Sequence, residues 1–441
     1  MKSADSLLDI VRELFPFHHS VVSDDSPMVA EKLRQYLPFE VSAFPSGAEV
    51  NGWKVPDNWR PVTARIMSNG RVFFDALSHP LGVGQLSPTF VGSIERKTLL
   101  EHLFFSERNP KATPYHWANL YRPAETDWAI CMPKTIYDQL PDEDLSVELI
   151  TEKEPGEMLV LDYFLPGDSP KTVLLNAHNC HPWQANDDLS GCAVGISALQ
   201  ELLSRKKRKF SYRLLIAPEL IGPVHWLNQQ NLKENPIIGA IMLKAVGNFS
   251  ALKLQSSFSG ESELDKAAHM VFDDRFGSYG SGGFREIYGN DETVFDSPGF
   301  EIPSISLTRY PFAEYHTDAD TPEALSPASL EETKSILLEI IDVLENDRKL
   351  RFAHRGLVSL SNPKYNLYMP APAPGLDKET YQEVQRRWNL LMNCLPRELN
   401  GENSIVDIAD KYSIPFFDVH KYLLEWEQKG LATEDYFENK D

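Results

Sequence analysis

The stretch between residues 172 and 204 restricts the fold of this chain more than any other. It begins with an apolar run, 172–175, and continues into a helix-like segment that starts with small residues, 190–195. Between them, residues 176–191 ("NAHNCHPWQANDDLSG") carry two histidines, a cysteine and two adjacent aspartates. Placing so many ionisable side chains at the end of a buried strand costs free energy unless something pairs them. A metal ion is the simplest such partner.

Strand-like and helix-like segments alternate from about residue 155 to residue 345. Short apolar runs are separated by longer segments in which apolar residues recur at helical spacing. Such alternation predicts an α/β fold in which a largely parallel sheet is flanked by helices. The expected strands are 159–164, 172–176, 212–217, 238–243 and 305–307, and the expected helices are 189–205, 222–232, 262–275 and 328–346.

The rest of the chain suggests an insertion and a separate C-terminal module. Residues 46–149 carry short β-type runs punctuated by Pro, Gly and Asn, which is typical of a β-rich domain. We therefore assign 1–45 and 150–350 to one domain that this insertion interrupts. A proline-rich stretch within 351–375 is typical of a linker. The pattern of 376–441 predicts a winged helix-turn-helix.

The charge balance restricts the partners of this protein. Its 441 residues include 43 Lys and Arg against 64 Asp and Glu, a formal net charge of −21. This balance argues against nucleic acid or an anionic membrane as a partner. No apolar run approaches the roughly 20 residues that span a bilayer, and four cysteines without paired spacing predict no disulfide framework. We expect a cytoplasmic protein, and the sequence is compatible with a homo-oligomer.

Further segments are expected to lie beside residues 176–191, because ligands of open α/β sheets bind beyond the carboxyl ends of the strands. Glu219 and His316 each follow an expected strand. A loop rich in Gly and Pro supplies Asp291 and Glu292. Imidazole and carboxylate together suit zinc, and three protein ligands leave a coordination position for water.

These motifs resemble those of the zinc-dependent aminopeptidase superfamily, which includes the bacterial leucyl aminopeptidases and the glutaminyl cyclases. The shared motifs are the histidines after the first strand, "NDDLSG", "PEL" and "YHTDADT". The chain resembles still more closely an aminopeptidase-like family of unassigned substrate that is linked to polysaccharide biosynthesis. It does so in "CHPWQANDDLSG", in an inserted β domain and in a C-terminal winged helix. The resemblance covers nearly the whole chain and implies a zinc-peptidase-like fold.

The resemblance implies a role for each residue that matches a motif. Asp187 matches the metal-binding aspartate, His316 the late histidine ligand, and Glu219 the general base. The first histidine ligand is open between two residues, because His178 directly follows the strand whereas His181 lies in the "CHP" of the closer family. We favour His181 and keep His178 as the alternative.

Two positions depart from the two-metal pattern of the superfamily. Leu220 stands where a second glutamate would bind a second zinc, and no acid lies near Lys244, where a further acid is expected. The matching ligands that remain are His181, Asp187 and His316, which can hold one zinc ion. The resemblance thus implies a single-zinc enzyme or a degenerate site with little activity.

Our first hypothesis is a mono-zinc hydrolase of an amide bond, most simply an aminopeptidase acting on a small peptide or an aminoacyl amide. The zinc would activate a water molecule for attack on the carbonyl, and Glu219 would take its proton. We assign Asp291, Glu292 and Arg285 to substrate binding. The alternatives are a deacylase or amidohydrolase acting on an aminoacylated sugar or small metabolite, and a non-catalytic binding protein on a decayed peptidase fold.

Some of these features also have ordinary structural explanations. Asp188 can cap the helix that follows it, Glu219 can be a first-turn acid that the helix dipole favours, and Arg285 can form a surface salt bridge. Residues 377–441 contain 8 Lys and Arg against 14 Asp and Glu, whereas a helix that reads DNA should be basic. We therefore expect the C-terminal module to contact protein and not DNA.

Overall fold

The computed structural model of the chain describes residues 6–121, 126–368 and 378–434. They form two compact units. The first comprises Met1–Gly260 and Gly280–Ser335, and the second comprises Glu261–Tyr279 and Ile336–Asp441. The insertion expected at 46–149 falls inside the first unit, so its boundaries stay predictions.

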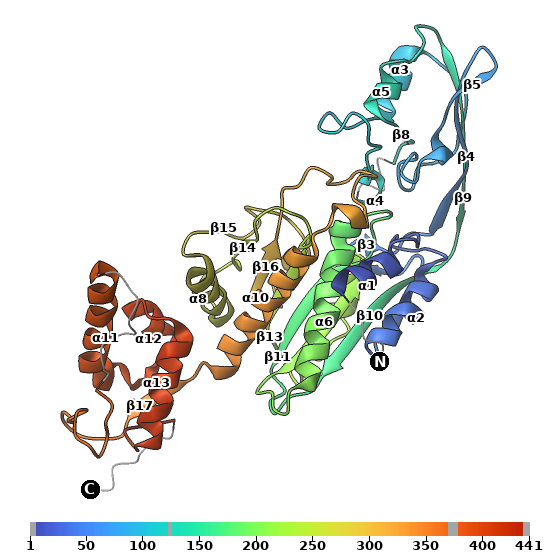
Figure 1. The fold of residues 1–441 in the computed structure, drawn as a ribbon. Helices are drawn as coiled ribbons and strands as arrows, with labels where there is room; N and C mark the ends of the chain where they lie inside the picture. Colours follow the sequence, from blue (N-terminus) through green and yellow to red (C-terminus); the bar gives the residue numbers. More distant parts are fainter. Residues whose placement is uncertain (1–5, 122–125, 369–377, 435–441) are drawn as a thin grey trace. The chain divides into compact units, whose positions relative to one another are not determined.

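An eight-stranded sheet forms the centre of the first unit (Figure 1). In spatial order its strands are β1 (Glu40–Pro45), β10 (Glu157–Leu165), β12 (Ser211–Ala217), β11 (Thr172–His178), β13 (Ile237–Lys244), β16 (Ser304–Thr308), β14 (Lys253–Gln255) and β15 (Gly280–Gly282). Strands β12, β11, β13 and β16 run parallel, and antiparallel neighbours adjoin them on both sides. The α/β class is therefore confirmed, with a sheet that is parallel at its centre and mixed at its edges.

Helices flank this sheet, as expected. Helix α6 (Ser190–Ser204) packs on its centre, where it contacts β11, β12 and β13. Helix α1 (Leu7–Leu14) packs against α6, and α2 (Ser26–Tyr36) contacts β10. Helix α7 (Ile221–Leu227) contacts β10, and α9 (Glu292–Phe295) contacts β13 and β16. Leu174 and Leu215 of the sheet and Trp226 of α7 belong to one buried apolar cluster, which anchors the strands that carry the site.

The expected helices are present, with one shorter than expected. Helix α10 (Pro327–Asn346) and α6 lie within one residue of the predicted bounds, and α8 (Glu263–Phe276) lies one residue later. Helix α7 ends at Leu227 instead of residue 232. The side chain of Asn228 donates to the carbonyl of Val224, and the polar residues that follow offer no apolar face to pack. Two short turns, η3 (Ala185–Leu189) and η4 (Pro322–Ala324), complete the central part.

The segment 46–149 is β-rich, as its sequence predicts. A four-stranded sheet has the order β5-β4-β9-β6, and two shorter pairs, β2 with β3 and β7 with β8, accompany it. Strands β4 and β9 pair antiparallel over 58–67 and 146–154, and Figure 1 shows them as a long ribbon. The elements are β2 (Glu49–Val50), β3 (Trp53–Lys54), β4 (Asn58–Ser68), β5 (Arg71–Asp75), η1 (Ala76–Ser78), β6 (Phe90–Ile94), α3 (Arg96–Glu101), β7 (Leu103–Phe104), α4 (Ala118–Tyr121), β8 (Ile130–Cys131), α5 (Lys134–Tyr137) and β9 (Leu145–Glu154).

The second unit combines helices with a small antiparallel sheet of order β18-β17-β19. Its remaining elements are β17 (Lys349–Phe352), α11 (Lys378–Glu398), β18 (Asn400–Ser404), α12 (Ile405–Tyr412), α13 (Phe416–Gln428) and β19 (Ala432–Thr433). The expected succession of helix, short helix, turn and helix is present, and β17 extends two residues into the expected linker. The winged-helix assignment stays a prediction. In the described ranges, every helix is too short or too polar to cross a membrane.

Candidate functional site

The parallel strands of the central sheet bring their carboxyl ends to one edge. His178 is the last residue of β11 and Lys244 the last residue of β13, and these two strands are neighbours. The loops that follow β12 and β16 carry Glu219 and His316. The side chains expected at the strand ends therefore meet, as the topology of an open α/β sheet requires.

Asp187 lies at the centre of this cluster, and its side chain is fully buried. Its Oδ1 is 2.8 Å from Lys244 Nζ and 3.1 Å from His178 Nε2. Its Oδ2 is 3.1 Å from His316 Nε2, and His181 Nδ1 lies 3.6 Å from Oδ1. Burial opposes the charged form, but Lys244 and His181 hold the pKa of the Asp187 carboxyl well below its usual range. Asp187 is therefore ionised and surrounded by nitrogen atoms.

Glu219 faces the cluster from the loop after β12. Its Oε2 is 3.4 Å from His181 Nε2, and its Oε1 is 3.7 Å from Lys244 Nζ. The hydroxyl of Tyr121 donates to Oε2 at 3.5 Å. Burial raises the pKa of Glu219, yet the positive charge of Lys244 and the nearby imidazole of His178 lower it overall. An ionised carboxylate in this position can accept a proton.

Three donor atoms of the cluster are candidates for holding a metal. One ligand atom from each of His181, Asp187 and His316 lies within 4.8 Å of the others. Within the described residues, His181 Nδ1, His316 Nε2 and Asp187 Oδ2 are buried without a hydrogen bond of acceptable geometry. Buried polar atoms are costly when left in this condition. Two imidazoles and a carboxylate are a usual donor set for zinc, so the residues present fit a zinc ion.

His178 is held differently from His181. The ammonium of Lys244 contacts Nε2 of His178. Burial, together with the charge of Lys244, lowers the pKa of His178 to about 4, so its imidazole is neutral and accepts from the ammonium. His178 also groups with Cys180 and His181, but burial raises the pKa of the Cys180 thiol, and a thiol is a poor ligand compared with a thiolate.

Asp291 and Glu292 lie beneath the site, where both are fully buried. Asp291 Oδ1 accepts from the backbone N–H of Leu220 at 2.6 Å, and Glu292 Oε1 accepts from that of Asn290 at 2.9 Å. Burial raises the pKa of both carboxyls. Neither acid is among the residues that line the pocket described below, and Asp291 holds the turn that follows Glu219. Their role in substrate binding stays a prediction.

A second layer of buried acids fixes the loops. Asp188 accepts from the backbone N–H groups of His178, Gly191 and Ala245 at 3.2, 3.3 and 3.0 Å. Helix capping thus explains only the hydrogen bond from Gly191, and the other two bonds hold the ends of neighbouring strands. Asp320 accepts from the N–H of Asp187 at 3.1 Å and of its preceding residue at 2.7 Å. Asp320 was missed by sequence reasoning, although it stands in "YHTDAD", four residues after His316.

An open pocket of about 450 Å³ lies in front of the cluster. Arg285, which the sequence assigns to substrate binding, is among its lining residues. Aromatic side chains from the 46–149 segment also contribute: Trp117 and Tyr121 line the pocket, and the ring of Tyr115 packs 5.3 Å from that of His316. Sequence reasoning missed these three aromatic residues, and the density of aromatic side chains in "YHWANLY" is the one signal that could have pointed to them. The full lining is Trp117, Tyr121, His181, Glu219, Leu220, Arg285, Ile287, Tyr288, Gly289, Tyr310, Tyr315 and His316.

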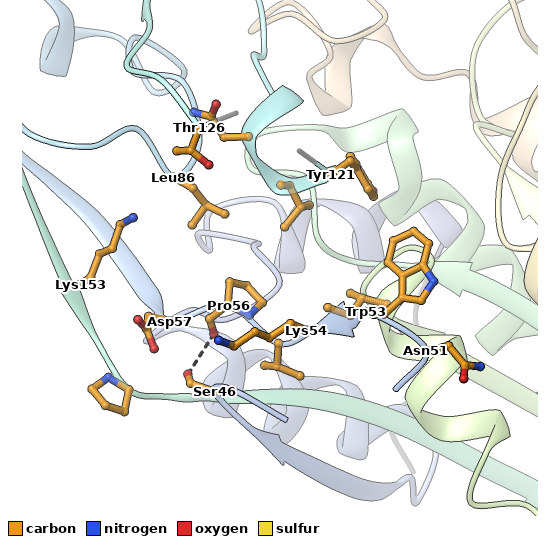
Figure 2. A pocket seen from close by; sticks show the side chains of 17 residues that line it. Ser46, Asn51, Trp53, Lys54, Pro56, Asp57, Leu86, Tyr121, Thr126 and Lys153 are labelled. Atoms are coloured by element: carbon orange, nitrogen blue, oxygen red, sulfur yellow. Dashed lines mark hydrogen bonds between the residues drawn. The ribbon is translucent and has the colours of Figure 1, made fainter. Parts of the chain in front are cut away.

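A second cavity of about 640 Å³ adjoins the first through Tyr121, which lines both. Figure 2 shows Trp53 and Tyr121 on one side of it and Lys153 on the other. The rings of Trp53 and Tyr121 meet edge to face at 6.3 Å. Ser46, which also lines this cavity, donates to the carbonyl of Pro56 at 2.9 Å. Because Tyr121 lines both the pocket and the second cavity, its side chain lies between them.

Comparison with known proteins agrees with this geometry. The model of the family described as a domain of unknown function, DUF4910, matches residues 8–347. A Clostridium acetobutylicum protein named for polysaccharide biosynthesis and an aminopeptidase-like domain is 28% identical over 421 residues, which cover 94% of this chain and 93% of the relative.

Solved structures show the same likeness. A crystal structure from Clostridium acetobutylicum that is described as a peptidase has a TM-score of 0.77 at 26% identity. The match covers 97% of this chain and 95% of the other chain. A zinc aminopeptidase of Bacillus subtilis has a TM-score of 0.57 at 14% identity, over 76% of this chain and 93% of its own, which shows the fold alone. The resemblance inferred from the motifs is confirmed. The chain therefore belongs to the DUF4910 family and has the fold of the zinc aminopeptidases.

Proposed function

We propose that this protein is a hydrolase of amide bonds that works with one zinc ion. The observation that carries the proposal is the set of buried, unsatisfied donor atoms of His181, Asp187 and His316 beside the ionised Glu219. A purely structural cluster would satisfy those atoms with hydrogen bonds. The peptidase-like fold supports the same class of reaction.

Each residue of the cluster has a distinct task in this proposal. His181, Asp187 and His316 hold the zinc, with His178 as the alternative histidine. When bound, zinc supplies a Lewis acid at the strand ends. Glu219 takes a proton from the attacking water at its carboxylate and returns it to the leaving nitrogen. The Tyr121 hydroxyl, 3.5 Å from Oε2, orients that carboxylate.

The charges around the pocket favour an acylated substrate over a free amine. Among the described residues that line it, Glu219 is the only carboxylate, and the proposal uses it as the base. A charged α-amine would therefore lack a partner, whereas the guanidinium of Arg285 can pair with a carboxylate. This observation favours the deacylase or amidohydrolase among the functions considered.

The test compares matched pairs of aminoacyl amides and their N-acylated forms as substrates. We expect zinc-loaded protein to cleave the acylated member, to stop when a chelator removes the metal, and to recover when zinc returns. His316→Ala should lose both zinc and hydrolysis, while the control His354→Ala, at an exposed histidine, should keep both. If wild-type protein holds zinc and cleaves neither member of any pair, the binding-protein alternative becomes the better one.

A further inference from the structure

We infer that the ammonium of Lys244 occupies the position beside Asp187 that a second metal ion would need. The site would then contain one metal and one fixed organic cation. This inference rests on the proposed function, because it takes His181, Asp187 and His316 as the ligands of the single zinc.

The atoms around Lys244 are those that a second ion would use. Nζ is 2.8 Å from Asp187 Oδ1 and 3.7 Å from Glu219 Oε1, and it contacts Nε2 of His178. Two carboxylates and an imidazole are suitable ligands for zinc. All three groups face the ammonium, which therefore stands where a second ion would have to bind.

The burial of Lys244 shows that this position is built for a cation. Its side chain is 1% exposed, and a buried ammonium is unfavourable unless opposite charges compensate it. Asp187 and Glu219 supply that compensation, and the ring of Tyr288 lies 4.9 Å from Nζ, close enough for a cation–π interaction. The cation is therefore a permanent part of the site.

Asp187 serves both cations at once. Its Oδ1 faces Lys244, while its Oδ2 faces His316 and the proposed metal position. With zinc bound, this one carboxylate would serve both the metal and the ammonium.

Lys244 acts through these neighbours and does not contact the substrate. It is absent from the residues that line the pocket and lies behind Glu219. It is therefore a positioning residue that fixes the carboxylates of Asp187 and Glu219 in place. Its measurable signature is the number of metal ions per chain.

The experiment counts metal after dialysis of the full-length protein against excess zinc. We expect one zinc per chain in the wild type and two in Lys244→Asp, because the new carboxylate joins His178 and Asp187 as a ligand. Lys244→Met should keep one, because its uncharged side chain still fills the position and adds no ligand. Lys171→Asp makes the same change of charge at an exposed position before β11 and should also keep one.

Cobalt substitution gives a second readout on the same proteins. Wild-type protein with cobalt should show the electron paramagnetic resonance signal of an isolated ion, whereas Lys244→Asp should show two coupled ions. Two ions in the wild type by either method, or one ion in a folded Lys244→Asp, would overturn the inference. If these counts hold and no amide is cleaved, the proposed function fails while the role of Lys244 stands.

Discussion

Individual residues at the strand ends adopt backbone conformations that most side chains avoid. Leu220, Ala245 and His316 have φ values of 61°, 51° and 52°, in the left-handed region. Each such residue costs on the order of 1–3 kcal/mol and persists only where its surroundings hold it. Asp291 holds the N–H of Leu220, and Asp188 holds that of Ala245. The buried acids thus stabilise the strained loops that carry the chemistry.

The first prediction concerns Glu219. Glu219→Gln keeps the shape of the side chain but cannot accept a proton, so zinc content should be unchanged while kcat falls about 10²–10⁴-fold. Metal analysis and steady-state kinetics on the cleaved amide check the two parts separately. Release of zinc from this variant would make Glu219 a ligand, and wild-type turnover would place the base elsewhere.

The second prediction concerns His19, which is 3% exposed and whose Nε2 donates to the carbonyl of Leu14 at 2.9 Å. Burial lowers the pKa of His19 to about 4 from 6.5. As the pH falls, the unfolded chain therefore binds a proton at His19 before the folded chain does. The contribution of neutral His19 to the free energy of unfolding is thus complete above pH 6.5. It is lost as the pH falls towards 4, and it amounts to about 3 kcal/mol in total.

The variant His19→Gln keeps a donor for Leu14 and cannot titrate. Urea titrations at pH 7.5 and pH 4.5 measure how far the free energy of unfolding falls between these two pH values. We expect the fall in His19→Gln to be smaller than that in the wild type by about 2 kcal/mol. His354→Gln, at an exposed imidazole, is the control and should follow the wild type. An unchanged pH dependence in His19→Gln would show that His19 does not titrate between the two states.

At the scale of elements, the contact between α6 and the sheet determines the shape of the site. Helix α6 begins two residues after Asp188, and its first turn lies against the end of β13. A Cβ atom on Gly191 would stand 2.1 Å from the carbonyl oxygen of Leu243 and 2.6 Å from the carboxylate of Asp188. Only glycine permits this approach, which accounts for the "SG" of the motif.

The third prediction follows from that contact. Gly191→Ala forces a methyl group against the backbone and a buried carboxylate. We therefore expect the free energy of unfolding to fall by about 1–3 kcal/mol, despite the better helix propensity of alanine. Gly92→Ala in β6 is the control, because a Cβ there meets nothing within 4 Å. Thermal unfolding of both compares them, and a Gly191→Ala protein as stable as the control would contradict this account.

Sequence periodicity and motif spacing predicted much of the fold and part of the site. The spacing of apolar residues predicted the strands and the helices α6 and α10. Glu219, Lys244 and His316 could be placed because each lies at or after the end of an apolar strand. The sequence could not choose between His178 and His181, since the path of the chain between them decides which imidazole contacts Lys244. Nor could it find Tyr121, because no local pattern reports that a distant segment reaches the sheet edge.

At the scale of the whole molecule, the net charge of −21 is the basis of the predicted choice of partners. The predicted winged helix has the general architecture of a DNA reader, but acids outnumber bases in 377–441 by 14 to 8. Phosphate contacts supply most non-specific affinity for DNA, and they require basic surfaces. A protein partner remains the proposal for this module.

The fourth prediction tests that proposal. Fluorescence anisotropy with labelled duplex DNA should show no appreciable binding at physiological salt, because repulsion between like charges opposes the complex. A further titration at low salt should raise the signal little. A salt-sensitive complex that depends on the DNA sequence would contradict the expectation and make the module a DNA reader.

The order of the strands along the chain also sets the time at which the site can form during synthesis. β16 is inserted between β13 and β14 in the sheet, yet it is made after both of them. His316 therefore leaves the ribosome after Asp187 and Lys244. Because a domain folds as a unit, the cluster can close only once this last strand and the loop after it have been made. On the proposed function, metal binding would then be a late step of maturation, completed only after the last histidine arrives.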